Sequence, residues 1–173
     1  FVDSEYYDAI EYCTKKNYFA GTGSTTFSPG NSMTRAMFAT VLYRMAGSPA
    51  VKGSAPFTDL KQSWYKNAVA WAVQKGITSG TGESKFSPDA PVTREQAAVF
   101  LQRFAQVRGD SISTDDADVK LPPGVSAWAS EGARWAMRKG VFTGGGSEMM
   151  NPGVYASREL LALALMRYDI IKR

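Results

Sequence analysis

Two stretches of this chain are near copies of each other. "TFSPGNSMTRAM" runs from Thr26 to Met37, and "KFSPDAPVTREQ" runs from Lys85 to Gln96. A more divergent third copy follows, so that a glycine, a proline and an arginine recur three times, as Gly21, Gly80 and Gly144, as Pro29, Pro88 and Pro152, and as Arg35, Arg94 and Arg158. Three tandem units of one kind indicate a repeat architecture, in which each unit buries its apolar surface against a neighbour.

Each unit has the pattern of a helix, a loop and a second helix. We expect the first helices over Glu5–Lys16, Trp64–Lys75 and Ala127–Lys139, where small and apolar residues recur on one helical face. An asparagine or a glycine follows each of them, which are the residue types that accept the left-handed conformation at a helix end. The second helices carry apolar residues at positions i, i+3, i+4 and i+7, and their expected N-caps are Thr34, Thr93 and Ser157.

None of these second helices can bury its apolar stripe alone, so three equivalent stripes most simply meet around one axis. We therefore predict one all-α domain over residues 1–173, with repeat units near 1–47, 57–106 and 117–173. In this prediction the units form a pseudo-threefold trimer around a central bundle of three helices. Trp71 and Trp135 are expected in the core, and Cys13 is expected to be a small buried residue.

The composition limits the classes of function. Twenty Lys and Arg are interspersed with sixteen Asp and Glu, giving a net charge of +4, and no basic run indicates nucleic-acid binding. No apolar stretch has membrane-spanning length and no signal-peptide pattern is present, so we expect a soluble chain without membrane insertion. Because Phe1 stands inside a repeat unit, we expect a piece of a larger protein.

Catalysis and metal binding are not expected. The chain has no histidine, which is the commonest general base and the commonest metal ligand. No isolated pair of carboxylates indicates a glycosidase. The glycine-rich loops fail both nucleotide-binding spacings, and Asp115, Asp116 and Asp118 fail the spacing of a calcium loop. We therefore predict no enzyme activity, cofactor or metal.

The motifs together resemble the S-layer homology (SLH) family. They are the F-x-D at Phe1 and Phe57, the aromatic first helix, the glycine-rich turn, F-S-P, and the T-R that opens the second helix. The resemblance covers essentially the whole chain and is strongest in the second unit. It implies grooves between neighbouring modules that bind an anionic secondary cell-wall polysaccharide, often one with pyruvate ketals. It also implies non-covalent anchoring of a larger protein at the bacterial cell surface.

The recurring arginines suit such a ligand, because a guanidinium donates two parallel hydrogen bonds to a carboxylate. Each stands one residue past an N-cap, where free backbone N–H groups also favour an anion. In the alternative interpretation, each arginine pairs with the aspartate of an F-x-D-like motif. The resemblance favours the ligand role, and the residues in question are Arg35, Arg94 and Arg158, and Asp3, Asp59 and Asp118.

Tryptophans and glycines complete the candidate site. The resemblance suggests that Trp64 and Trp128 lay an indole face against sugar C–H groups, and that loop glycines offer backbone N–H groups to the ligand. The alternatives are rim aromatics and tight turns that need no ligand. The glycines are Gly21, Gly23, Gly80, Gly82 and Gly144.

The units depart unequally from the family pattern. Glu5 stands where the other units have Trp64 and Trp128, and the third unit lacks the family phenylalanines. We therefore expect a groove built around the motifs of unit two to dominate. The T-R-A-E glutamate is also replaced, and of its replacements only Gln96 can close a capping box. A protein-interaction or self-assembly module that binds no glycan is the other function considered.

Overall fold

The computed structural model describes residues 4–114, 119–142 and 150–171. The described residues form six α-helices, one short 3-10 helix and isolated bridges, which confirms the all-α class. Asp3, Asp118 and Gly144 lie outside the described residues, as do Asp115 and Asp116. The helices are α1 (Ser4–Lys15), α2 (Arg35–Met45), α3 (Ser63–Gln74), α4 (Arg94–Val107), α5 (Ser130–Arg138) and α6 (Arg158–Ile171), with the 3-10 helix η1 (Ala127–Ala129) before α5.

The expected helix starts are confirmed by their caps. The hydroxyl of Thr34 accepts the Met37 N–H at 3.2 Å, and the hydroxyl of Thr93 accepts the Gln96 N–H at 3.3 Å. The Gln96 side chain in turn accepts the Thr93 N–H at 3.2 Å, so the capping box that the sequence allowed here is present.

The first helix of the third unit differs from the expectation, because a 3-10 turn precedes α5. The Glu95 carboxylate on α4 accepts the N–H and the hydroxyl of Ser126, at 2.9 and 3.0 Å. This anchor holds the chain close to α4 just before the 3-10 turn, and such turns are frequent at helix N-termini. Gly132 on α5 also requires a close approach, since a Cβ there would lie 2.8 Å from the Val99 side chain.

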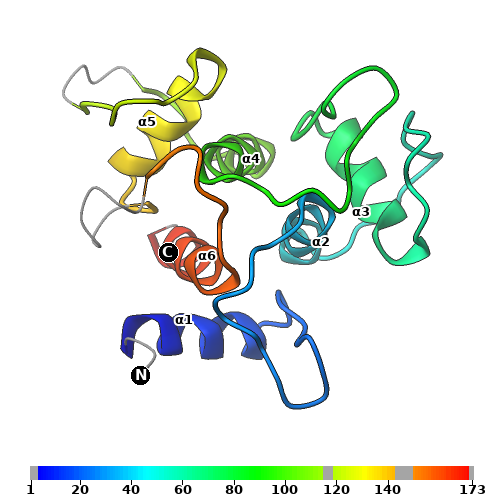
Figure 1. Ribbon diagram of the computed structural model, residues 1–173, viewed down its shortest axis with the longest axis horizontal. Helices are drawn as coiled ribbons and strands as arrows, with labels where there is room; N and C mark the ends of the chain where they lie inside the picture. The colour runs from blue at the N-terminus through cyan, green and yellow to red at the C-terminus, as the bar shows by residue number, and fades with distance from the viewer. Residues whose placement is uncertain (1–3, 115–118, 143–149, 172–173) are drawn as a thin grey trace.

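The helices are arranged in two shells (Figure 1). α2, α4 and α6 lie near the middle and are seen end-on, while α1, α3 and α5 lie outside them. Each outer helix packs mainly on the inner helix of another unit, with α3 on α2, α5 on α4, and α1 on α6. Each unit is therefore covered by its neighbour. The threefold symmetry of this arrangement and the unit boundaries stay predictions.

The core contains the residues expected there. Trp71, Trp135 and Cys13 are all buried, which confirms the prediction for each. Trp71 packs between Tyr43 and Phe104, with ring centroids 5.5 and 6.1 Å away. In the described part of the chain, no helix combines the length and the apolar character needed to cross a bilayer.

A ring of backbone hydrogen bonds joins the three units where the inner helices begin. The Met33 N–H donates to the Ala156 carbonyl at 3.0 Å, the Ala156 N–H donates to the Val92 carbonyl at 2.9 Å, and the Val92 N–H donates to the Met33 carbonyl at 2.9 Å. All three residues are buried. Every unit therefore both donates to one neighbour and accepts from the other, and no unit can move alone without leaving buried polar groups unpaired.

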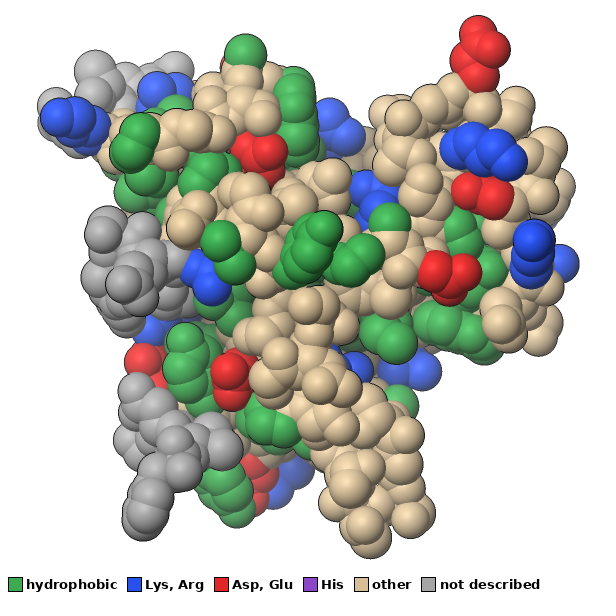
Figure 2. Space-filling model, in the orientation of Figure 1, with side chains coloured by type: hydrophobic (Ala, Val, Ile, Leu, Met, Phe, Trp, Pro, Cys, Tyr) green, Lys and Arg blue, Asp and Glu red, His purple; other side chains and the backbone are tan. Residues whose placement is uncertain are grey.

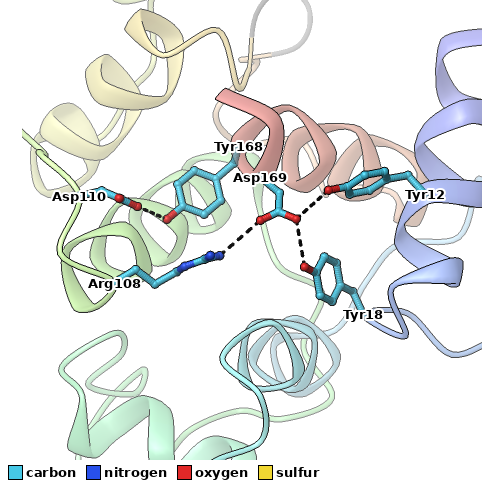
Figure 3. Close-up of polar contacts among 6 residues, drawn as sticks. All are labelled: Tyr12, Tyr18, Arg108, Asp110, Tyr168 and Asp169. Atoms are coloured by element: carbon cyan, nitrogen blue, oxygen red, sulfur yellow. Dashed lines mark hydrogen bonds and ion pairs between the residues drawn. The ribbon is translucent and has the colours of Figure 1, made fainter. Parts of the chain in front are cut away.

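A polar cluster lies toward the other end of the inner helices (Figure 3). The buried Asp169 carboxylate on α6 accepts hydrogen bonds from the hydroxyls of Tyr12 and Tyr18, at 2.8 and 3.0 Å. Arg108 lies 3.6 Å from the same carboxylate. The cluster joins the first repeat unit to the end of the last helix.

Candidate functional site

Two grooves open between repeat units, with volumes of about 300 and 440 Å³. Each is lined by a glycine loop, by one face of the inner helix that follows this loop, by an exposed tryptophan of the next unit, and by a buried arginine of the preceding unit in the ring. The first groove contains Gly21, Arg44, Trp64 and Arg158. The second groove contains Gly80, Arg103, Trp128 and Arg35.

Each groove thus combines residues of all three units. The motifs of unit two, which the sequence suggested would form one groove, are divided, with Trp64 in the first groove and Gly80 in the second. Arg94 lines neither of these two grooves. Gly144, the third glycine of the repeat, lies outside the described residues.

Arg35 is buried in the loop of the second unit, with 3% of its surface exposed. Its Nε donates to the Phe86 carbonyl at 2.8 Å, and its terminal nitrogen lies 3.5 Å from the Thr78 hydroxyl. The guanidinium also lies over the rings of Phe86 and Phe100, at 4.9 and 5.3 Å from their centroids. Burial lowers the pKa of Arg35 and nearby Asp59 opposes that shift, yet a guanidinium keeps its charge at neutral pH.

Arg158 occupies the corresponding place in the loop of the first unit, with 5% of its surface exposed. It donates to the carbonyls of Phe27 and Ala20, both at 2.7 Å. Its guanidinium lies over the rings of Phe27 and Phe19, 4.5 and 5.5 Å from their centroids. Burial lowers the pKa of Arg158 as well. Both arginines therefore hold the glycine loop of a neighbouring unit in place.

The expectation of free N–H groups beside the recurring arginines is wrong. The backbone N–H groups of Arg35, Arg94 and Arg158 each donate at 2.9 Å to a carbonyl of a neighbouring unit, those of Ala90, Val154 and Asn31 respectively. The next N–H groups along α2 and α6 donate in the same way, to Pro88 and Pro29. Adjacent loops therefore cover these helix N-termini, and the ligand interpretation loses that part of its support.

The Asp59 carboxylate forms its hydrogen bonds with backbone N–H groups and not with an arginine side chain. It accepts the N–H of Phe86 at 3.0 Å and that of Ser87 at 2.8 Å, which holds the F-S-P segment of its own unit. Burial by itself would raise the pKa of Asp59, but these backbone hydrogen bonds lower it overall. Within the described residues, Asp59 forms no ion pair with Arg94.

The two candidate tryptophans are exposed at the groove edges. Trp64 has 51% and Trp128 58% of its surface exposed, whereas Trp71 and Trp135 are buried. The Tyr65 ring packs edge-on against the Trp64 ring, with 4.9 Å between the ring centroids. An exposed and supported indole face leaves room for a ligand to stack on it.

The loop glycines are needed by the loops themselves. Gly80 has a φ of +92°, and a Cβ there would meet the Lys85 carbonyl at 2.5 Å and the Phe57 ring at 2.7 Å. A Cβ on Gly21 would meet the Thr26 carbonyl at 2.7 Å, and one on Gly23 the Thr26 hydroxyl at 2.8 Å. Only Gly82 has open space around it among these four. The tight-turn explanation therefore accounts for Gly21 and Gly80, since the Thr26 hydroxyl beside Gly23 belongs to a side chain that can move.

Two groove residues were missed in the sequence. Arg44 and Arg103 lie on the groove faces of α2 and α4, and they donate to the carbonyls of Tyr18 and Ile77, at 3.4 and 3.3 Å. A signal was available, because both stand at the same point of the repeat, as does Arg167 on α6. Extending the repeat alignment to the end of the second helix would have found them.

The charged groups that line the grooves are all positive. No acidic side chain lines either groove among the residues that the structure describes. On the face shown in Figure 2, acidic and basic side chains are interspersed over the molecule rather than gathered in one basic stripe. The lining of each groove therefore carries a positive charge, which favours an anionic ligand.

Comparison with known proteins shows what the chain is similar to. It is 27% identical over 164 residues to the Surface-layer 125 kDa protein of Lysinibacillus sphaericus, covering 92% of this chain and 14% of that protein. It is 36% identical over 99 residues to an endoglucanase of a Bacillus species, covering 57% of this chain and 10% of that protein. With the cellulosome-anchoring protein of Acetivibrio thermocellus, the identity is 33% over 100 residues, 55% of this chain and 22% of that protein.

The chain thus spans less than a quarter of the length of each of these relatives. The family model for the S-layer homology domain matches residues 2–39 and 56–98. Together these findings support cell-surface anchoring and association with the cell surface or cell wall. The match of these two segments to that model, together with the similarity to a surface-layer protein, confirms the resemblance to the S-layer homology family that the sequence predicted.

Proposed function

We propose that this chain anchors a larger protein to the cell wall by binding an anionic, pyruvylated secondary cell-wall polysaccharide in the grooves between its repeats. The observation that carries the proposal is the pair of grooves, each with arginines, an exposed tryptophan and no acidic lining residue among those described. This pairing of charge and aromatic surface suits an acidic sugar.

The chemistry of a pyruvate ketal matches the grooves. The ketal holds one carboxylate in a fixed orientation on a sugar ring, and a planar guanidinium binds a carboxylate through two parallel hydrogen bonds. The indoles of Trp64 and Trp128 can pack against the C–H face of the same sugar.

This chain matches only a small part of each relative, which fits an anchoring segment that has no catalytic role of its own. The endoglucanase is matched over 10% of its length and the cellulosome-anchoring protein over 22%. We propose that any catalytic activity of a parent protein resides outside this chain. Grooves filled by side chains would have favoured the self-assembly alternative, and the open volumes of about 300 and 440 Å³ do not give it that support.

Cosedimentation with cell-wall sacculi tests the proposal. The chain is expected to pellet with intact sacculi and to stay in solution once the secondary polysaccharide has been stripped. Sacculi from cells that lack the pyruvyl-transferring step provide the second comparison, and we expect them to bind much less protein. Equal binding to stripped sacculi would exclude the polysaccharide, and equal binding to pyruvate-free sacculi would exclude the ketal.

A further inference from the structure

The two grooves each contain two arginines in different environments, and we propose that the more exposed ones, Arg44 and Arg103, bind the ligand carboxylate. Arg158 and Arg35, which lie in the same grooves, are positioning residues for the glycine loops. This inference rests on the proposed function and names the groups that perform it. It reverses the assignment that the sequence repeats suggested for the arginines of the T-R motif.

The buried arginines already have partners for the groups that would hold a carboxylate. Arg158 donates from Nε and from a terminal nitrogen to two backbone carbonyls at 2.7 Å. Its guanidinium lies over two aromatic rings, and 5% of its surface is exposed. Arg35, with 3% of its surface exposed, donates from Nε to one loop carbonyl, and its terminal nitrogen lies 3.5 Å from the Thr78 hydroxyl. A ligand carboxylate that paired with Nε of either arginine would compete with a loop carbonyl.

Most N–H donors of Arg44 and Arg103 make no hydrogen bond within the described part of the chain. Each makes one hydrogen bond to a backbone carbonyl, at 3.4 and 3.3 Å, and neither forms an ion pair with a carboxylate in the described part of the chain. Arg44 is exposed and Arg103 half-buried. A guanidinium has five N–H donors, so most of each fork remains available to a ligand.

At the boundary between α6 and α1, an arginine of the repeat binds a carboxylate of the chain itself, as we propose that Arg44 and Arg103 bind the carboxylate of a ligand. Arg167 stands at the point of the repeat that Arg44 and Arg103 occupy, and it binds the Glu5 carboxylate at 2.5 Å. Glu5 stands at the point of Trp64 and Trp128. A carboxylate that approaches from the tryptophan side of a groove therefore reaches this arginine.

The same geometry predicts how a ligand lies in the two described grooves. Its carboxylate contacts Arg103 or Arg44, and its sugar ring extends toward Trp128 or Trp64, which lines the same groove. This placement suits a sugar with a carboxylate fixed at one end of the ring. Two such sites per chain are expected for a short ligand.

The test uses the whole chain and a synthetic hexose glycoside with a pyruvate ketal, with its methyl ester as the uncharged control. Titration calorimetry gives the affinity and the number of sites. Arg103→Gln should remove one of the two sites, and Arg44→Gln with Arg103→Gln should weaken binding at least about 30-fold, the scale of a lost charge-assisted hydrogen bond. Arg103→Lys should recover little. Lys66→Gln, which removes an exposed charge on α3, is the matched control and should bind normally.

The outcomes separate the two proposals. If the unmodified chain binds neither the ketal glycoside nor the intact polysaccharide, the proposed function fails and this inference fails with it. If the unmodified chain binds and the double variant binds equally well, with an unchanged melting temperature, the inference alone is overturned. Arg35→Gln and Arg158→Gln should lower the melting temperature, whereas Arg44→Gln and Arg103→Gln should leave it nearly unchanged.

Discussion

The boundary between α6 and α1 differs from the two boundaries that contain the described grooves. At those two, Trp64 and Trp128 face groove arginines that pair with no carboxylate in the described residues. At the α6–α1 boundary, Glu5 replaces the tryptophan and binds Arg167. Farther along the same interface, Tyr12 stands where Trp71 and Trp135 stand, and it donates to Asp169. At this boundary an ion pair stands where the other two have an exposed indole, and a polar cluster stands where they have a buried indole.

This comparison shows that equivalent positions of a repeat can serve opposite purposes. A boundary that leaves its outer arginine available suits an external anion, while a boundary that supplies its own carboxylate contributes to closure of the ring. The α6–α1 boundary joins the first repeat to the last, and it is the boundary whose two helices lie farthest apart along the chain. Side-chain contacts there have to hold together segments that no short connection keeps close.

The largest effect is expected from removing the first repeat unit. A fragment of residues 57–173 lacks α1, which covers α6, and α2, which covers α3, and it also lacks Met33 of the backbone ring. We expect it to lose most of the free energy of unfolding and its cooperative transition, because two apolar faces become exposed. Urea unfolding followed by circular dichroism measures this. Undiminished stability of the fragment would show that the ring does not need closure.

A smaller loss is expected when a buried groove arginine is truncated. Arg158→Ala leaves the carbonyls of Phe27 and Ala20 without their donor, and should lower the free energy of unfolding by about 3 kcal/mol. Arg44→Ala, which removes an arginine of the same groove with little burial, should cost less than about 0.5 kcal/mol. Chemical denaturation of both variants provides the measurement. Equal losses would remove the distinction between positioning and ligand-binding arginines.

The polar cluster at the α6–α1 boundary should make stability decline at alkaline pH. Burial and the hydrogen bond to Asp169 raise the pKa of Tyr18 from 10.0 to about 12. A tyrosine whose pKa is higher in the folded chain contributes fully below pH 10, and that contribution is lost as the pH rises toward 12. Unfolding curves across this range should show the decline, and Tyr18→Phe should make it shallower.

The control for this prediction concerns Cys13. Burial also raises the pKa of its thiol, to about 12, so it titrates in the same range. Both the parent and Tyr18→Phe are therefore compared in a Cys13→Ala background. An identical pH dependence with and without the Tyr18 hydroxyl would mean that the cluster does not govern alkaline stability.

A smaller loss of stability than that of Arg158→Ala is expected for Glu5→Gln. The carboxylate is half exposed, so breaking its pair with Arg167 should cost no more than about 1 kcal/mol. The same change removes a negative charge beside Arg167, and we expect the variant to stay on sacculi at higher salt than the parent. Salt elution from sacculi measures this. Weaker retention would indicate that the α6–α1 boundary contributes to anchoring through the ion pair itself.

Much of the local structure was determined by the sequence. The repeated T-R with its hydroxyl N-cap predicted the starts of α2, α4 and α6, and Gln96 predicted the capping box. The burial of Trp71, Trp135 and Cys13 followed from helical periodicity. These features depend on residues a few positions apart, whose contacts are present in any fold that contains the helix. Caps and apolar stripes are therefore readable from one chain.

Only the tertiary structure decided which units meet and which arginines remain available. An outer helix has the same apolar stripe whether it packs on the inner helix of its own unit or on that of a neighbour, so the sequence did not show that α3 packs on α2. The position of each buried arginine in the next unit's loop depends on that choice. The separation of Trp64 from Gly80, the loss of free N–H groups at the helix starts, and the pairing of Glu5 with Arg167 all follow from it. The physical reason is that burial and hydrogen bonding between units are set by contacts among residues far apart in the chain, and the repeated pattern, being the same in every unit, cannot specify which copy supplies the partner.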